Sequence, residues 1–381
     1  MNRWKRPLTI MTCLLSLILG AGAAPAFSQT ARIQSITGNG KVKIQRQNRT
    51  NWDLASPGKD FKDGDQIFPD SGMKVLVRCP SQTDPIRVKA GVVSGIGSIC
   101  VNLVARDVRG SHLDLATLGG FDPTIPYLIT PRHTLLLTQK PLLRWNAVPG
   151  TTEYTVEVKS PKRTLWQTKT KNNETPYAGP ALEAGIPYTV VIRTNSGKSS
   201  LDEMTPDGKS KSTHLEFRVL RPAETPTIAN TKPSEIADIL ALVDLYSNYV
   251  LQESLLASYQ LPRDYAETYN LTGEAIGLLE SVIQRGQSSP LIHRTLGDLY
   301  WQTGLVHPAE VEYKKAIALT KTPESLEDVT RAQEQLGQIY WVMGKKDEAH
   351  QAYLQAKEGY KSLGDQSKVE ELQAQLERLK I

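Results

Sequence analysis

The amino-acid sequence predicts a multidomain β + α protein in which β domains come first and an all-helical repeat domain follows. Two observations support this prediction. Up to about residue 220, apolar and polar residues alternate in short runs separated by glycine and proline, whereas beyond residue 234 the apolar residues recur every three to four positions. In addition, the stretch LGDLYWQTG at 296–304 returns as LGQIYWVMG at 336–344, which is typical of helical repeats.

The first 28 residues predict a secretory signal peptide. The stretch MNRWKR is basic, and an uncharged run follows from Leu8 to Ala24. Small residues allow cleavage after Ala26 or after Ser28, and we favour Ser28. The alternative is an uncleaved membrane anchor, but the run is short and is interrupted by glycines and Pro25. We therefore expect an exported chain, in the periplasm or outside the cell, that is not an integral membrane protein once cleaved.

Residues 29–118 predict a small β domain, because GKVKIQR, KVLVRC and IRVKAGVV alternate apolar and polar residues. Cys79 and Cys100 lie in this segment, and in an oxidising compartment such a pair favours a disulfide. A reactive thiol and a metal site are the alternatives. The pair Gly64 and Asp65 is interpreted as a plain turn rather than as a ligand site.

The order of GKVKIQR, Trp52 and FKDGDQIFPDSGMKVLVR resembles the FecR-like domain of bacterial envelope proteins. The resemblance implies an extracytoplasmic β module. In that family the domain is joined to a membrane span and a cytoplasmic region, and this sequence shows neither. Transmembrane signalling would therefore require an uncleaved N-terminal segment.

Residues 119–220 predict a second β domain. Trp145 ends an apolar strand and is expected in the core, and Tyr154 begins a strand with clear alternation. The stretch LEAGIPYTVVIR resembles the tyrosine corner of immunoglobulin-like and fibronectin III-like sandwiches. The resemblance implies a β-sandwich in which the Tyr188 hydroxyl bonds to nearby backbone.

A proline-rich linker is predicted at 221–234, and the helical domain at 235–381. The repeated positions resemble the tetratricopeptide repeat, which implies an all-α solenoid that binds proteins. The family repeat is 34 residues long, so the offset of 40 implies extra residues in TKTPESLEDVTR. GEAIGLLESVI fits the second helix of an earlier unit, and Val369 to Leu379 fits a terminal capping helix. The matching positions are Leu296/Leu336, Gly297/Gly337, Tyr300/Tyr340, Trp301/Trp341, Gly304/Gly344, Ala309/Ala349, Tyr313/Tyr353 and Ala316/Ala356.

By resemblance to the family, eight side chains on the first helices of two units are expected to line a partner-binding groove. Trp301 and Trp341 would be neighbours there and would anchor a peptide. The alternative is that both tryptophans pack against the preceding unit or the first helix. The groove lacks the Lys and Asn residues with which the family holds a terminal carboxylate. The eight residues are Arg294, Asp298, Trp301, Gln302, Glu334, Gln338, Trp341 and Val342.

No catalytic, cofactor-binding or metal-ligating pattern is recognisable. The six histidines show no metal spacing, no phosphate-binding loop occurs, and the run Ser111, His112, Asp114 cannot form a triad on one strand face. The net charge of +5 falls to +2 without the first 28 residues, so nucleic acid is not an expected partner.

These patterns predict a non-enzymatic envelope scaffold that binds a protein or peptide through its repeats. The domain order also resembles secreted proteins of cyanobacteria. The alternative is attachment to peptidoglycan or another glycan through the β domains, with Trp52 and Trp166 as possible stacking residues. A third possibility is a hydrolase that recruits its substrate through the repeats.

Overall fold

The structure is a computed structural model that describes residues 30–46, 49, 51–62, 65–79, 85–100, 118–205, 215–222, 236–247, 270–319 and 325–379. Strands occupy the N-terminal β region, residues 30–95, and the second β region, residues 118–222, while helices dominate the helical region, residues 236–379. The predicted signal peptide, most of the predicted linker, Gly64 and the run Ser111 to Asp114 lie outside the described residues.

The N-terminal β region consists of two sheets packed on one apolar core. Their strand orders are β4-β1-β6-β7 and β3-β2-β5-β8. Ile33, Ile44 and Val75 are fully buried between them, as the alternation in the sequence predicted. The strands are β1 (Thr30–Thr37), β2 (Val42–Gln45), β3 (Trp52–Leu54), β4 (Asp60–Lys62), β5 (Gln66–Pro69), β6 (Lys74–Arg78), β7 (Ile86–Arg87) and β8 (Ser94–Gly95), followed by the one-turn helix α1 (Ile96–Ile99).

Two details of this region agree with the sequence analysis. Cys79 and Cys100 are joined by a disulfide, 21 positions apart in the chain. Asp65 belongs to a turn, because its carboxylate accepts a hydrogen bond from the Lys62 amide at 3.0 Å and pairs with Arg46 at 2.6 Å. These two contacts account for the Asp65 carboxylate as part of a turn, without a ligand.

The second β region also has two sheets over one core, with strand orders β10-β16-β15-β12-β13 and β14-β11-β9. Trp145 is fully buried in this core. The Tyr188 hydroxyl accepts a hydrogen bond from the Glu183 amide at 2.8 Å, which is the predicted contact with nearby backbone. The strands are β9 (Leu128–Thr130), β10 (Thr134–Leu136), β11 (Leu142–Trp145), β12 (Tyr154–Lys159), β13 (Thr164–Thr170), β14 (Glu174–Pro176), β15 (Pro187–Thr194) and β16 (Glu216–Val219).

The helical region stacks antiparallel helix pairs. A serine cap and a first-turn proline start α7, because the Ser289 hydroxyl accepts from the Ile292 amide and Pro290 needs no backbone donor there. Gly304 and Gly344, both at positive φ, end the first helix of each pair. The helices are α3 (Ile236–Ser247), α6 (Thr272–Gln284), α7 (Pro290–Gln302), α8 (Val306–Ala318), α9 (Leu326–Val342), α10 (Lys346–Ser362) and α11 (Gln366–Leu379).

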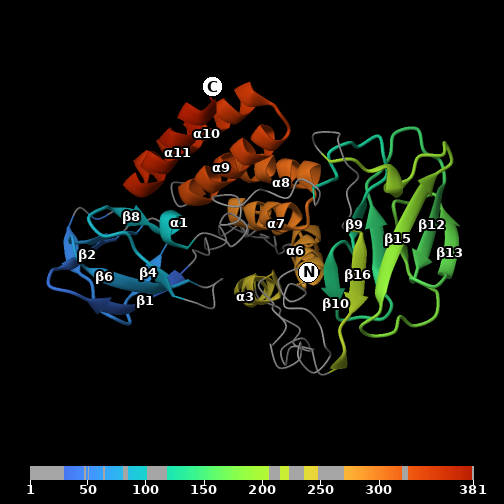
Figure 1. The fold of residues 1–381 in the computed structure, drawn as a ribbon, viewed down its shortest axis with the longest axis horizontal. Helices are drawn as coiled ribbons and strands as arrows, with labels where there is room; N and C mark the ends of the chain where they lie inside the picture. Colours follow the sequence, from blue (N-terminus) through green and yellow to red (C-terminus); the bar gives the residue numbers. More distant parts are fainter. Residues whose placement is uncertain are drawn as a thin grey trace, which may run out of the picture.

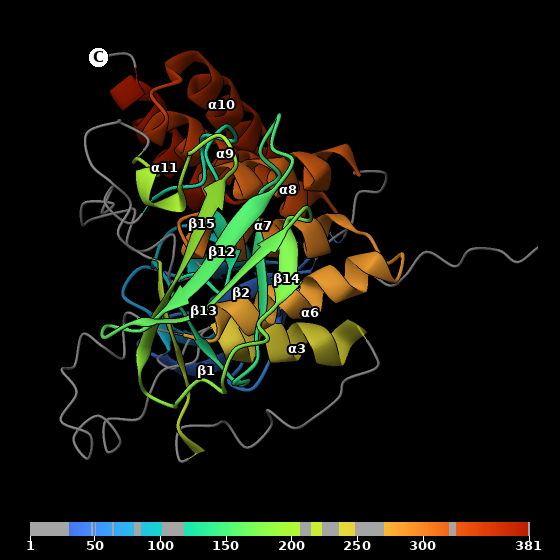
Figure 2. The same cartoon turned by 90° about the vertical axis from the view of Figure 1, so that its right-hand side faces the viewer.

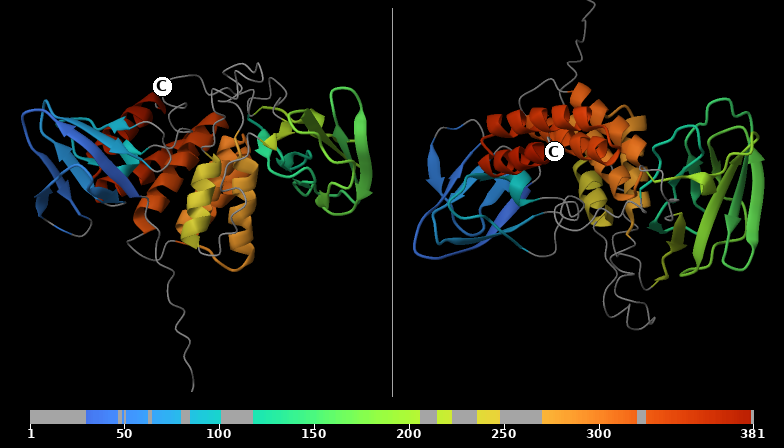
Figure 3. Two further views of the ribbon diagram at one scale, coloured as in Figure 1. Left: turned by 90° about the horizontal axis from the view of Figure 1, so that it is seen from below. Right: turned by 45° about the horizontal axis from the view of Figure 1, so that its top comes forward.

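The helical region lies between the two β regions, as Figure 1 and both views of Figure 3 show. The N-terminal β region meets the turn between α10 and α11, where the Gln66 side chain donates to the Leu363 carbonyl at 2.8 Å. The second β region, whose five-stranded sheet faces the viewer in Figure 2, meets the turn between α7 and α8, where the Gly119 amide donates to the Gly304 carbonyl at 2.8 Å. Segments far apart in sequence are thus joined at two turns of the helical stack.

Candidate functional site

A glycine facing a tyrosine ring holds each repeated helix pair together. A Cβ atom on Gly297 of α7 would lie 2.7 Å from the ring of Tyr313 on α8, and a Cβ atom on Gly337 of α9 would lie 2.5 Å from the ring of Tyr353 on α10. Both distances are too short for a real contact, so the helices approach more closely than any other residue permits. This close approach sets the orientation of the first helices and of the side chains they carry.

The eight predicted groove residues lie on α7 and α9, at equivalent positions of two successive units, but they differ widely in exposure. Trp341 alone of the eight is exposed, with 46% of its surface accessible. Asp298, Gln302 and Val342 are half-buried. The other four, which are Arg294, Trp301, Glu334 and Gln338, are buried.

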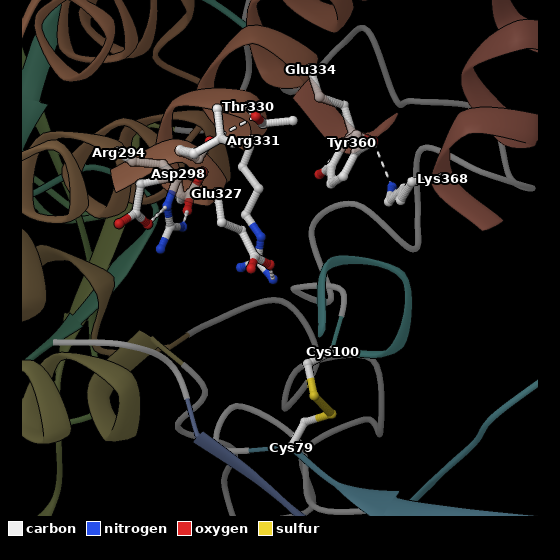
Figure 4. Close-up of polar contacts among 12 residues, drawn as sticks. Cys79, Cys100, Arg294, Asp298, Glu327, Thr330, Arg331, Glu334, Tyr360 and Lys368 are labelled. Atoms are coloured by element: carbon white, nitrogen blue, oxygen red, sulfur yellow. Dashed lines mark hydrogen bonds and ion pairs between the residues drawn. A yellow bond between two sulfur atoms is a disulfide. The ribbon is translucent and has the colours of Figure 1, made fainter. Parts of the chain in front are cut away.

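The Arg294 side chain forms its ion pairs inside the helical region. Its guanidinium pairs with Asp298 one turn along α7 at 2.7 Å (Figure 4). It also pairs with Asp328 on α9 at 2.7 Å, and Asp298 accepts from the Tyr313 hydroxyl at 2.8 Å. Burial opposes the charge, but the carboxylates of Asp328 and Asp298 overcome it and raise the pKa of Arg294. The guanidinium therefore remains charged and joins the two units.

Glu334 takes the equivalent position on α9 and is also engaged internally. Its carboxylate accepts from the Tyr360 hydroxyl at 2.7 Å and pairs with the Lys368 amine at 2.6 Å (Figure 4). Lys368 belongs to α11 and is 2% exposed. Since a buried charge is tolerated only when it is paired, this contact ties the capping helix to the last unit.

The interpretation of Trp301 and Trp341 as an exposed neighbouring pair is wrong for Trp301. That side chain is 4% exposed and belongs to the apolar core that α3 shares with α6 and α7. The adjacent Gln302 amide donates to the carbonyl of Ser247, the last residue of α3, at 3.1 Å. Helix α3 therefore packs against this end of the stack, which agrees with the alternative interpretation for Trp301 and leaves Trp341 as the exposed tryptophan.

A chain of three polar side chains has the donor and acceptor order of a hydrolytic triad. Ser288 lies 2.8 Å from Nε2 of His293, and Nδ1 of His293 lies 2.6 Å from Glu312. However, Lys315 also binds Glu312 at 2.8 Å, and His293 is 4% exposed between α7 and α8. We interpret the contact as a connection between the two helices, and no pattern in the sequence indicated it.

A groove of about 360 Å³ opens between α9 and α10. Its lining includes Gln333, Leu336 and Tyr340 of α9, none of which is among the eight predicted groove residues. The groove is therefore distinct from the predicted one, and sequence analysis missed it. The apolar residues that line the groove follow the same periodicity as the residues of the helix core, so the sequence does not distinguish the two.

The two tryptophans considered for glycan stacking have different surroundings. Trp166 packs edge-on against Tyr177, with ring centroids 5.3 Å apart, at the border of the core of the second β region. Trp52 lies on the edge strand β3 and is 37% exposed. Trp52 is thus exposed, whereas Trp166 is half-buried.

Comparison with known families agrees with the geometry of the last complete helix pair. A tetratricopeptide repeat model matches residues 330–358, which cover most of α9 and the first part of α10. No curated protein matches the chain. Tetratricopeptide repeats serve protein–protein interaction, so the match indicates a protein-binding scaffold.

Membrane-spanning helices and metal clusters are both absent from the described residues. Among them, no helix is long and apolar enough to cross a membrane. Over the same ranges, no group of three or more His, Cys, Asp and Glu side chains could hold a metal ion.

Proposed function

We propose that this protein is a non-enzymatic, exported scaffold of the bacterial envelope that binds a protein or peptide partner through its tetratricopeptide repeats. The observation that carries the proposal is Trp341. It lies within the matched repeat and is 46% exposed at a position where the family places its groove. Exposed aromatic side chains of this size are the commonest anchors of protein interfaces.

In this proposal the two β regions are a FecR-like module and an immunoglobulin-like module. The sequence order around Trp52 supports the first. The second is supported by two largely antiparallel sheets over one core, by buried Trp145, and by the bond between the Tyr188 hydroxyl and Glu183. Both modules would hold the repeats in place rather than carry out chemistry.

Export is proposed from the composition of the first 28 residues, and the Cys79–Cys100 disulfide suits an oxidising compartment. N-terminal sequencing of the protein from an envelope fraction tests it. We expect the chain to begin at Gln29. A chain that retains Met1 and stays with the cytoplasmic fraction would contradict export.

Affinity capture from an envelope extract of the source organism tests partner binding. The bait is the mature chain, compared with Trp341→Ala and with Trp52→Ala, a second exposed tryptophan on the N-terminal β region. We expect a protein that the unmodified chain and Trp52→Ala retain and that Trp341→Ala loses. Retention by Trp341→Ala would place the partner site away from the repeats.

The proposal that the protein is not an enzyme is tested most sharply at the contact of Ser288, His293 and Glu312. We expect no turnover of activated esters such as p-nitrophenyl acetate above the rate of the Ser288→Ala variant. A rate that disappears in Ser288→Ala would show that the serine is a nucleophile, and the scaffold would then also be a hydrolase.

A further inference from the structure

The sheet β3-β2-β5-β8 has an aromatic outer face. In its register, Lys43 of β2 lies between Leu54 of β3 and Phe68 of β5, and Gln45 lies between Trp52 and Gln66. Successive residues of a strand alternate between faces, and Ile44 and Ile67 are buried on the other one. We call the outer side the aromatic face; its six residues are Lys43, Gln45, Trp52, Leu54, Gln66 and Phe68.

Large apolar side chains are unusually accessible on this face. Leu54 is 61% exposed and Trp52 is 37% exposed. The rings of Trp52 and Phe68 lie edge to face, with centroids 6.5 Å apart and an interplanar angle of 69°. Apolar side chains clustered on the solvent side of a sheet add nothing to its core and mark a binding surface.

Polar groups surround the rings and carry positive charge. The Lys43 amine lies 5.6 Å from the centroid of the Phe68 ring, and the Lys59 amine donates to the Leu54 carbonyl at 3.0 Å. None of the six residues has a carboxylate, and residues 29–118 contain 13 Lys and Arg against 8 Asp and Glu. The face therefore favours an anionic ligand.

The shape of the face favours a polymer that lies across it. At the edge, β3 is only three residues long, which is too short for a peptide to add as a further strand. At the other side, Gln66 reaches the turn between α10 and α11, so that this turn borders the face. The described groove between α9 and α10 lies elsewhere in the molecule.

We propose that the aromatic face binds an acidic polysaccharide. The apolar C–H face of a sugar ring stacks on the exposed Trp52 ring, the side-chain amide of Gln45 beside it suits sugar hydroxyl groups, and the Lys43 amine pairs with a uronate carboxylate. This inference does not depend on partner binding by the repeats.

Affinity electrophoresis of the full mature chain in gels containing polygalacturonate tests the proposal, with neutral dextran as the comparison polymer. We expect polygalacturonate to retard the protein and Trp52→Ala to weaken the apparent affinity about tenfold, equivalent to about 1.4 kcal/mol. Trp52→Tyr, which keeps a ring, should retain most of the affinity. Lys43→Gln should reduce the part of the affinity that falls with added salt.

Trp341→Ala is the matched control, because it removes an exposed tryptophan from the helical region. We expect it to bind polygalacturonate like the unmodified protein while losing its protein partner. No retardation by polygalacturonate, or equal retardation of Trp52→Ala and unmodified protein, would overturn the proposal. Loss of the captured protein partner from Trp52→Ala, with no effect on polysaccharide binding, would instead make the aromatic face a protein site.

Discussion

Gly337 shows how a single residue sets the distance between two helices. A methyl group at this position would meet the Tyr353 ring 2.5 Å away, inside the close contact of α9 and α10. We expect Gly337→Ala to lower the free energy of unfolding by about 1–3 kcal/mol, because overpacking forces the ring or the helix to move. Urea unfolding followed by circular dichroism measures the change.

Gly277 provides the control for this substitution. It also lies within a helix, α6, but nothing is found within 4 Å of a Cβ built on it. Gly277→Ala should therefore raise the free energy of unfolding by about 0.5–1 kcal/mol through helix propensity alone. Equal losses in the two variants would show that helix packing is not what requires Gly337.

Glu310 makes the stability of the helical region depend on pH in acid. His307, 3.6 Å from one carboxylate oxygen, and Lys314, 2.6 Å from the other, lower the pKa of Glu310 from 4.5 to about 2. A lowered pKa means that the stabilisation is fully present above pH 4.5 and is lost as the pH falls towards 2. We expect Glu310→Gln to flatten the decline of the unfolding free energy over this interval, measured by urea unfolding at several pH values. An unchanged decline would contradict the assignment.

The burial and the hydrogen-bond partners of some residues could be predicted from the sequence, whereas those of others could not. The contact of the Tyr188 hydroxyl with Glu183 follows from a local pattern, since both partners lie within five positions. The burial of Trp301 does not, because it depends on α3, a helix about 55 positions earlier that packs against the same end of the stack. The internal use of Arg294 likewise depends on Asp328 of the next unit.

The offset of 40 residues between the repeats has a physical explanation at the scale of the element. Helix α9 has 17 residues whereas α7 has 13, so part of the extra length extends the first helix of the second unit. The sequence analysis placed the extra residues in TKTPESLEDVTR, and part of that stretch belongs to α9. The extension also supplies Asp328, the second partner of Arg294.

The capping helix α11 depends on the buried pair of Lys368 and Glu334. We expect Lys368→Met to destabilise α11 by about 3–5 kcal/mol, because it leaves the Glu334 carboxylate buried without its cation. Hydrogen exchange should accelerate in residues 366–379 before the rest of the helical region opens.

The double variant Lys368→Met/Glu334→Leu separates charge from packing. It removes both charges, so it should recover much of the stability that the single variant loses. If hydrogen exchange in α11 is as slow in the single variant as in the unmodified protein, the ion pair contributes nothing to the stability of α11. The apolar contacts of Leu372 and Leu376 would then hold this helix by themselves.

At the scale of the whole molecule, the contacts that place the β regions could not be predicted from sequence. Arg132 donates a hydrogen bond to the Thr303 carbonyl, which is 171 positions away in the chain. Arg144 pairs with Glu280, which is 136 positions away. Neither arginine belongs to a local pattern, whereas strands and helices follow from the period of nearby apolar residues. The sequence thus predicted the kinds of element, and long-range polar contacts decide how they are assembled.

The contact between the start of the second β region and helix α8 depends on one buried ion pair. Arg132 binds Glu203 at 2.9 Å, and the other Glu203 oxygen accepts from the Gly120 amide at 2.5 Å. This holds Gly119 and Gly120 where their carbonyls accept from the amides of Val306 and His307, both at 3.0 Å. The ion pair therefore supports the contact with α8 without touching that helix itself.

We accordingly expect Arg132→Leu to release this contact, because Glu203 would be left buried without its cation. Hydrogen exchange of the amides of Val306 and His307 should accelerate, while peptides from α10 keep their protection. The control is Arg32→Leu, whose pair with Asp60 is exposed on both sides and should leave the exchange of these amides unchanged. Unchanged exchange at Val306 and His307 in Arg132→Leu would mean that apolar packing around Leu118, Tyr127 and Leu305 joins the β and helical regions without help from the charges.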